Sequence, residues 1–191
     1  MEIETKMSIP TLAETRKMSE IRHGNSYYAG FIRASFHFKT LRESEQVLIY
    51  EDGIYKSGGE TSIKEECQKI IPDCKKNQCN EVVNTIRRET YLKRKQEFDN
   101  YNNLINLKNG ILDLETKQLI PHSPKYLFRI QLPITYDQNA TCEQFMKYLD
   151  QCFSEEKNKI CFLESFASTL LPNIHLEKMF MNVGSGANGK S

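Results

Sequence analysis

The chain lacks any long apolar run. Its 191 residues hold no stretch close to the roughly 20 uninterrupted apolar residues of a membrane span. Its first ten residues, MEIETKMSIP, place acids and polar groups where a signal peptide has an apolar core. We therefore expect no membrane partner and a cytoplasmic location.

The chain also lacks a large excess of positive or of negative residues. Lys and Arg number 26 against 25 Asp and Glu, so the formal net charge is +1. Nucleic-acid binding must then be argued from local patches instead of from the total charge. With 39% hydrophobic and 27% charged residues, the composition indicates one globular domain, or one domain and part of a second, and disfavours disorder, collagen and coiled coil.

Closely spaced cysteine pairs are absent. The first three cysteines are too far apart for a C-x-x-C knuckle, and no second close pair stands at a zinc-finger distance. Thiols stay reduced in the cytosol. We expect free thiols and no metal centre among Cys67, Cys74, Cys79, Cys142, Cys152 and Cys161.

The pattern of the remaining residues predicts an α+β fold of helices with short antiparallel hairpins. Residues 1–35 read as a loosely attached helical lead-in with a polar break at 23–26. Asp52-Gly53 predicts a two-stranded ribbon at about 46–56, and Asn109-Gly110 between two apolar runs predicts a second hairpin. No repeat of 20–50 residues and no low-complexity tract is visible.

Helices and one further strand are predicted between and after these hairpins. Apolar residues from Ile63 to Cys74 recur at helical spacing, with Pro72 as a terminator, and Asn80 is a suitable N-cap for a second helix with Val82, Val83 and Ile86 on its apolar face. A strand is expected over 126–132, a helix from 139–141 onward, and a helix over about 156–171. The last helix has a predicted core stripe of Ile160, Leu163, Phe166, Ala167 and Leu170.

The far end of the second predicted helix carries a basic strip. It comprises Arg87, Arg88, Lys93, Arg94 and Lys95, with only Glu89 in opposition. One interpretation is a solvated surface that complements the helix dipole. The other is a strip that contacts DNA phosphates, with Tyr91 and Tyr101 nearby to stack on bases.

A phosphate-binding loop stands at the end of the sequence. After the apolar segment 178–183, the last eight residues match G-x-x-x-x-G-K-[ST] in full. We expect ATP and Mg²⁺ as cofactors, with Lys190 as the catalytic contact to the β- and γ-phosphates and the Ser191 hydroxyl on Mg²⁺. The predicted nucleotide-binding residues are Gly184, Ser185, Gly186, Ala187, Asn188, Gly189, Lys190 and Ser191.

The position of the loop predicts a truncated motor. An α/β ATPase core needs on the order of 100 further residues after its phosphate loop. We therefore expect a fragment that does not hydrolyse ATP alone. The predicted domains are a lead-in at 1–35, an accessory module at 36–175, and the first strand and loop of an α/β ATPase domain at 176–191.

Several segments together resemble a known family. The runs at 109–114, 121–124 and 132–137 are similar to the module that precedes the ATPase of poxvirus-type and phage/plasmid-type helicase–primases. The loop matches that family's superfamily 3 pattern, G-x-G-x-N-G-K-S. The resemblance implies an AAA+-like motor in a replicative DNA helicase, with hexameric rings that move 3′→5′ on a DNA strand or fork, and a collar or connector role for this module. The upstream primase domain of the family is not expected here.

A second function stays open, and four further residues have structural interpretations. The alternative to a helicase is a non-enzymatic DNA-binding or oligomerisation module with a remnant loop. His122, in a Pro-His-Ser-Pro turn, is expected to make a structural hydrogen bond, and His175 to lie in a surface connector. Asp113 and Asp137 are each explained by an Asx turn or cap.

Overall fold

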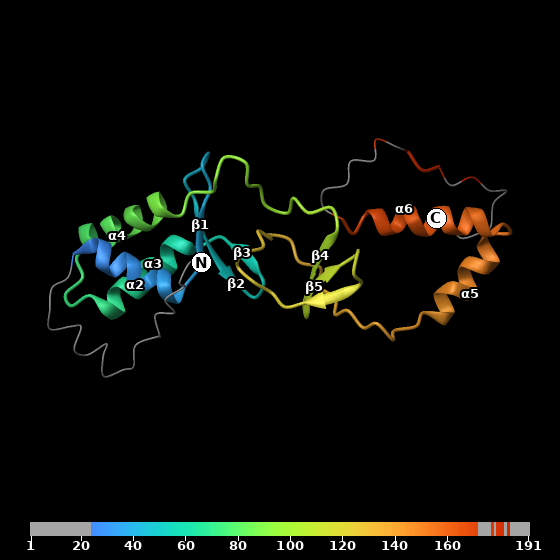
Figure 1. Cartoon of the computed structure of the whole chain (residues 1–191), viewed down its shortest axis with the longest axis horizontal. Coiled ribbons are helices and arrows are strands. Elements are labelled where there is room, and N and C mark those ends of the chain that lie inside the picture. The colour runs from blue at the N-terminus through green and yellow to red at the C-terminus, as the bar shows by residue number, and fades with distance from the viewer. Residues whose placement is uncertain (1–23, 172–176, 178, 182, 184–191) are drawn as a thin grey trace. The chain divides into compact units, whose positions relative to one another are not determined.

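The computed structural model describes residues 24–171, 177, 179–181 and 183 (Figure 1). The described residues form two compact units. The first holds the residues up to Phe98 together with Ser123–Arg129, and the second holds Asp99–His122 and the residues from Ile130 onward. Helices and two small antiparallel sheets make up these units, so the α+β prediction is confirmed at that level.

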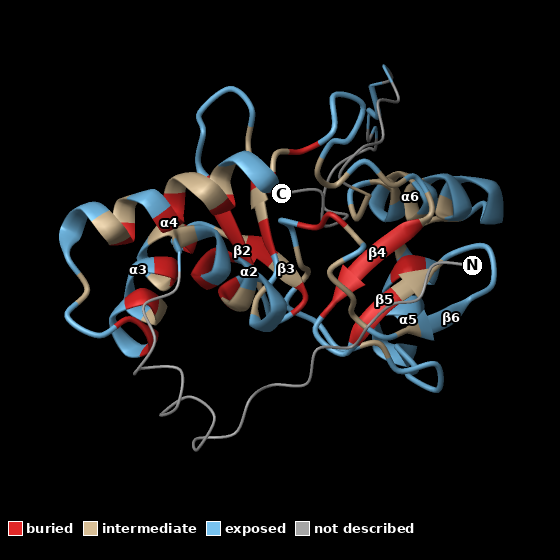
Figure 2. Cartoon of the chain, turned by 60° about the vertical axis from the view of Figure 1, so that its left-hand side comes forward, coloured by how far each residue is buried: buried red, intermediate tan, exposed pale blue. Residues whose placement is uncertain are grey.

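The first unit packs three helices against a three-stranded antiparallel sheet of order β1-β2-β3. The central strand β2 is buried on both faces (Figure 2), because Val47 and Ile49 face the helices while Leu48 faces the opposite side. The elements are α2 (Asn25–Ser35), β1 (Phe38–Thr40), β2 (Val47–Glu51), β3 (Ile54–Lys56), α3 (Gly59–Ile70) and α4 (Lys76–Glu89).

Helix α2 belongs to this core. Tyr28, Ala29 and Ile32 are at most 1% exposed and pack in the same cluster as residues of α3 and α4. The expectation of a loose attachment is therefore wrong for this helix. The predicted boundaries at 35 and 175 stay predictions.

The hairpin and helix predictions for the first unit are largely confirmed. Strands β2 and β3 pair around Asp52-Gly53, and both turn residues have positive φ. Helix α3 ends at Ile70, two residues before Pro72. Helix α4, however, begins at Lys76, so the predicted N-cap at Asn80 is wrong, and Cys79 joins the predicted apolar face.

The second unit is built on β4 (Leu104–Leu107), β5 (Gly110–Asp113) and β6 (Gln118–Ile120), paired antiparallel in that order. The predicted hairpin is confirmed, but its turn lies one residue earlier than predicted: Leu107 pairs with Gly110, so the turn residues are Lys108 and Asn109 and Gly110 begins β5. Gly110 has φ +152°, and a Cβ there would lie 2.7 Å from the carbonyl oxygen of Ile120. A side chain at this position would push β6 away from β5.

The strand predicted over 126–132 is not formed. The Phe128 carbonyl accepts from Tyr55 N–H in the first unit at 2.7 Å, whereas Leu132 N–H donates to Asn106 O in the second unit at 2.9 Å. Between them, Ile130 N–H donates to the Asp99 carboxylate at 3.0 Å. Because the hydrogen bonds go to three separate partners, no continuous ladder develops.

Helices α5 (Glu143–Cys152) and α6 (Glu156–Ser168) form as predicted, but with little burial. Helix α5 starts at Glu143, after an Asx turn at Asp137, and Leu149 is its buried residue. Helix α6 has no buried residue; Ile160 is 47% exposed and Phe166 is 58% exposed. The predicted core stripe is therefore wrong in the described part of the chain.

Three predictions fall outside the described residues: the start of the lead-in (1–23), His175 and the phosphate loop (184–191). Of the strand predicted before the loop, Met179–Met181 are described without regular secondary structure and are exposed. In the described ranges, no helix has both the length and the apolar character that a bilayer crossing requires.

Core packing in the first unit gives a stability prediction. Ile86 of α4 is fully buried, so Ile86→Ala should lower the free energy of unfolding by about 2–5 kcal/mol. Glu81→Ala, on the exposed face of the same helix, should change it by less than about 0.5 kcal/mol. Urea unfolding followed by far-UV circular dichroism measures both. Equal effects would contradict this packing of α4.

The thiols give a reactivity prediction. Burial raises the pKa of Cys67 to about 12, so at pH 8 this thiol is protonated and enclosed. Iodoacetamide at that pH should alkylate the exposed Cys142 and Cys161 at once and Cys67 only after urea is added. Peptide mass spectrometry resolves the three sites. Labelling of Cys67 at the rate of the exposed thiols would contradict the arrangement of α3 and α4.

Candidate nucleic-acid interface

The predicted basic strip lies in the first unit, but not on one helix. Helix α4 ends at Glu89, so Arg87 and Arg88 lie on its last turn, and Lys93, Arg94 and Lys95 follow in a separate segment. The helix stops where Thr90 N–H and its hydroxyl both bond the Ile86 carbonyl, at 3.0 and 2.8 Å. The prediction of one helical strip is therefore corrected to two adjacent segments.

Residues after the helix are held on the edge of β1. Thr40 N–H donates to Thr90 O at 2.9 Å, and Leu92 N–H donates to Thr40 O at 3.0 Å. The two threonine hydroxyls are buried and lie 2.8 Å apart. This pairing places the basic residues 93–95 beside β1 and fixes the backbone from which they project.

The five basic residues differ in whether an ion pair already engages them. Arg87 is half-buried and donates to Glu60 and, at 3.1 Å, to Asn84 Oδ1. Its guanidinium thereby ties α4 to α3. Across the described ranges, no side-chain ion pair involves the exposed Arg88, Lys93, Arg94 or Lys95. Four of the five predicted residues are therefore accessible to a phosphate, and Arg87 has a structural partner instead.

Arg42 is a further cation at this surface. Its side chain donates to Leu92 O, and its guanidinium lies 5.6 Å from the ring centroid of Tyr91. Tyr91 is therefore already stacked on one face. In the sequence, Arg42 is followed by Glu43 and Glu45, so this stretch is not recognisable as basic. The fold alone brings Arg42 to the strip.

Histidine and aspartate predictions are confirmed where the structure describes them. His122 Nε2–H donates to Leu107 O at 2.9 Å and to Asn106 Oδ1 at 3.0 Å, which links the Pro-His-Ser-Pro turn to β4. Asp113 accepts from Glu115 N–H and Asp137 from Asn139 N–H, both at 2.9 Å, as Asx turns do. In the described part of the chain, no hydrogen bond or ion pair joins His122, Asp113 and Asp137 to one another.

Nothing in the described part of the chain resembles a metal centre. No cluster of three or more His, Cys, Asp or Glu side chains there is able to hold an ion. The residues expected to bind ATP and Mg²⁺ lie in 184–191, outside this part, so the nucleotide site stays a prediction.

Comparison with known proteins places the chain in a family. The model of the family "D5 N terminal like" matches residues 12–154, about three quarters of the chain. The chain therefore belongs to the D5 N-terminal-like family, which is the N-terminal region of D5-like primase–helicase proteins. No curated protein matches the sequence. The matched region covers the first unit from α2 onward and the second unit as far as α5.

The strip predicts a difference between two neighbouring arginines. Arg88→Ala should weaken binding of a fluorescein-labelled oligothymidylate and lower the salt slope by about 1, because one phosphate contact is lost. Arg87→Ala should leave that slope unchanged and lower the melting temperature, because Glu60 loses its partner. Fluorescence anisotropy over a salt series measures the first effect. The reverse pattern would contradict the assignment of Arg87 to the fold.

Proposed function

We propose that this chain is the accessory module of an ATP-driven replicative DNA helicase of a virus, plasmid or phage, joined to the start of its motor. Membership of a primase–helicase family supports the module, and the sequence at 184–191 supports the motor. The observation that carries the proposal is a complete phosphate-loop pattern downstream of a D5 N-terminal-like region. The assembly proposed is a ring, hexameric by the family resemblance, in the cytoplasm.

ATP binding would follow from the chemistry of the loop. Glycines 184, 186 and 189 allow backbone N–H groups to turn toward the β-phosphate without Cβ collisions. Lys190 would neutralise charge on the β- and γ-phosphates, and the Ser191 hydroxyl would bind Mg²⁺. The group that activates water and the acid that completes the Mg²⁺ site would come from the ATPase domain proper.

DNA would be held by the module through its exposed cations. Among the described residues, no ion pair engages Arg88, on the last turn of α4, or residues 93–95, which follow the segment bonded to β1. Contacts of this kind bind the phosphate backbone without regard to sequence, which suits a protein that moves along a strand or sits at a fork.

A non-enzymatic DNA-binding or assembly module remains the second candidate. The same accessible cations favour it, since they need no motor to act. The two candidates differ in whether residues 184–191 bind nucleotide at all.

Substitution of the loop lysine tests the helicase proposal. In a protein that contains this chain followed by a complete ATPase domain, DNA-stimulated ATP hydrolysis should fall at least about 100-fold with Lys190→Ala, because an electrostatic contact to the transferred phosphoryl group is lost. Lys147→Ala, an exposed lysine of α5, is the control and should retain activity. Unchanged hydrolysis in the Lys190 variant would exclude the proposed motor and favour the second candidate.

A further inference from the structure

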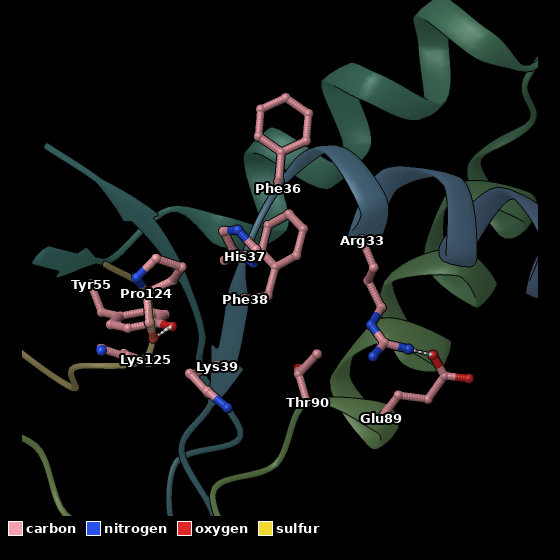
Figure 3. A pocket seen from close by; sticks show the side chains of 10 residues that line it. All are labelled: Arg33, Phe36, His37, Phe38, Lys39, Tyr55, Glu89, Thr90, Pro124 and Lys125. Carbon is pink, nitrogen blue, oxygen red and sulfur yellow. Dashed lines mark hydrogen bonds and ion pairs between the residues drawn. The ribbon is translucent and has the colours of Figure 1, made fainter. Parts of the chain in front are cut away.

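A pocket of about 310 Å³ lies in the first unit, and its lining includes none of the five strip residues. Its walls come from the end of α2, from β1, from the end of α4 and from the segment 123–129 (Figure 3). The volume is at the small end of ligand sites, enough for a phosphate group with part of a nucleoside.

Positive charge dominates the lining. Arg33, Lys39 and Lys125 come from three segments far apart in the sequence, and Glu89 is the one acid among the lining residues. Glu89 forms an ion pair with Arg33. Three cations less one carboxylate leave a formal charge of +2 at a site in a chain whose total is only +1.

Lys39 is the least compensated of these cations. It is half-buried, and within residues 24–171 no ion pair or side-chain hydrogen bond engages its ammonium group. Burial, then Lys93 and Arg33, lower the pKa of Lys39. A lysine in such a place is usually paired with a carboxylate, because an unpaired partly buried charge is costly.

The position of Lys39 is fixed by its neighbours. Phe38 and Thr40 on either side of it are buried, and Thr40 is bonded on both sides to the segment after α4. Figure 3 shows Lys39 between Pro124 and Lys125 on one side and Thr90 on the other. An anion that entered this space would meet the Lys39 ammonium group on a backbone that needs little reorganisation.

Lys125 is brought to the pocket by a second set of bonds. The Tyr55 hydroxyl donates to Pro124 O at 2.7 Å, and Tyr55 N–H donates to Phe128 O at 2.7 Å. Tyr55 is 2% exposed, so both bonds are shielded from water. The segment that carries Lys125 is thereby held against β3, while its ammonium group lies 4.7 Å from the Tyr126 ring centroid.

We propose that this pocket binds one phosphate group, either of a DNA backbone or of a free nucleotide. The Lys39 and Lys125 ammonium groups supply positive charge and hydrogen-bond donors for a phosphate, while the Arg33 guanidinium is held by Glu89. Phe36 also lines the pocket, and its ring packs against the hydrophobic core of the first unit. The inference goes beyond the proposed function, because it uses neither the phosphate loop nor the accessible residues of the strip.

Glutamine substitution in the 191-residue chain tests the pocket. Lys39→Gln and Lys125→Gln should each weaken binding of a labelled oligothymidylate by about tenfold, because each removes one charge-assisted hydrogen bond. Lys147→Gln removes the same charge from α5 and should change binding less than twofold, and Lys39→Arg should retain it. The side chain of Lys125 is exposed, so its variant should fold even if Lys39→Gln does not; melting curves check both.

Competition separates the two sources of phosphate. If thymidine monophosphate displaces the oligonucleotide from the unsubstituted chain but not from the Lys125→Gln variant, the pocket also binds free nucleotides. No displacement, with the same Lys125 effect, would assign it to the backbone, and either result supports the site. Equal losses in the Lys125 and Lys147 variants, or no loss in either, would overturn it. If Arg88→Ala still weakened binding in that case, the proposed DNA contact would stand without the pocket.

Discussion

Tyr55 provides the constraint on which the first unit depends. The chain leaves this unit after Phe98 and returns for Ser123–Arg129, and Tyr55 receives the returning segment with its backbone N–H and its hydroxyl. Phe128 is then 2% exposed, and Leu127 packs with Tyr55 on the face of the sheet opposite the helices. Without these bonds that face would be open, and the lining of the basic pocket would lose one of its walls.

A second pairing, between Thr40 and Thr90, sets where the positive charge lies. The pairing lies just after the end of α4 and holds the following residues along β1. Cations from the end of α4, from β1 and from the segment after α4 therefore lie close together. The total charge of the chain is close to zero, yet this part of the first unit is rich in cations without acidic partners. The proposed DNA binding rests on this local accumulation of positive charge.

Local sequence signals were sufficient for the elements that depend on near neighbours. The two hairpins and the helix before Pro72 follow from turn chemistry and periodicity, and the structure contains all three, with the second turn one residue earlier than predicted. Strands β1 and β6 were not predicted, because each has three residues, too few for a period to appear.

Features that depend on distant residues were missed or misread. The run at 126–132 has the composition of a strand, but its hydrogen-bond partners lie in two different units. The apolar stripe of α6 predicts a core that the described residues do not supply. Charge was recognised only where it is contiguous: the strip around Arg88 was found, whereas Arg33, Lys39 and Lys125 are separated by up to 92 positions (125 − 33) and meet only in the fold.

Hydrogen exchange with and without single-stranded DNA tests the central claim, that the first unit carries the DNA-binding surface. The account predicts slower amide exchange on DNA binding in residues 37–40, 87–95 and 123–129, with little change in α5 and α6. Slower exchange confined to α5 and α6, or no change anywhere at low salt with DNA in excess, would contradict it.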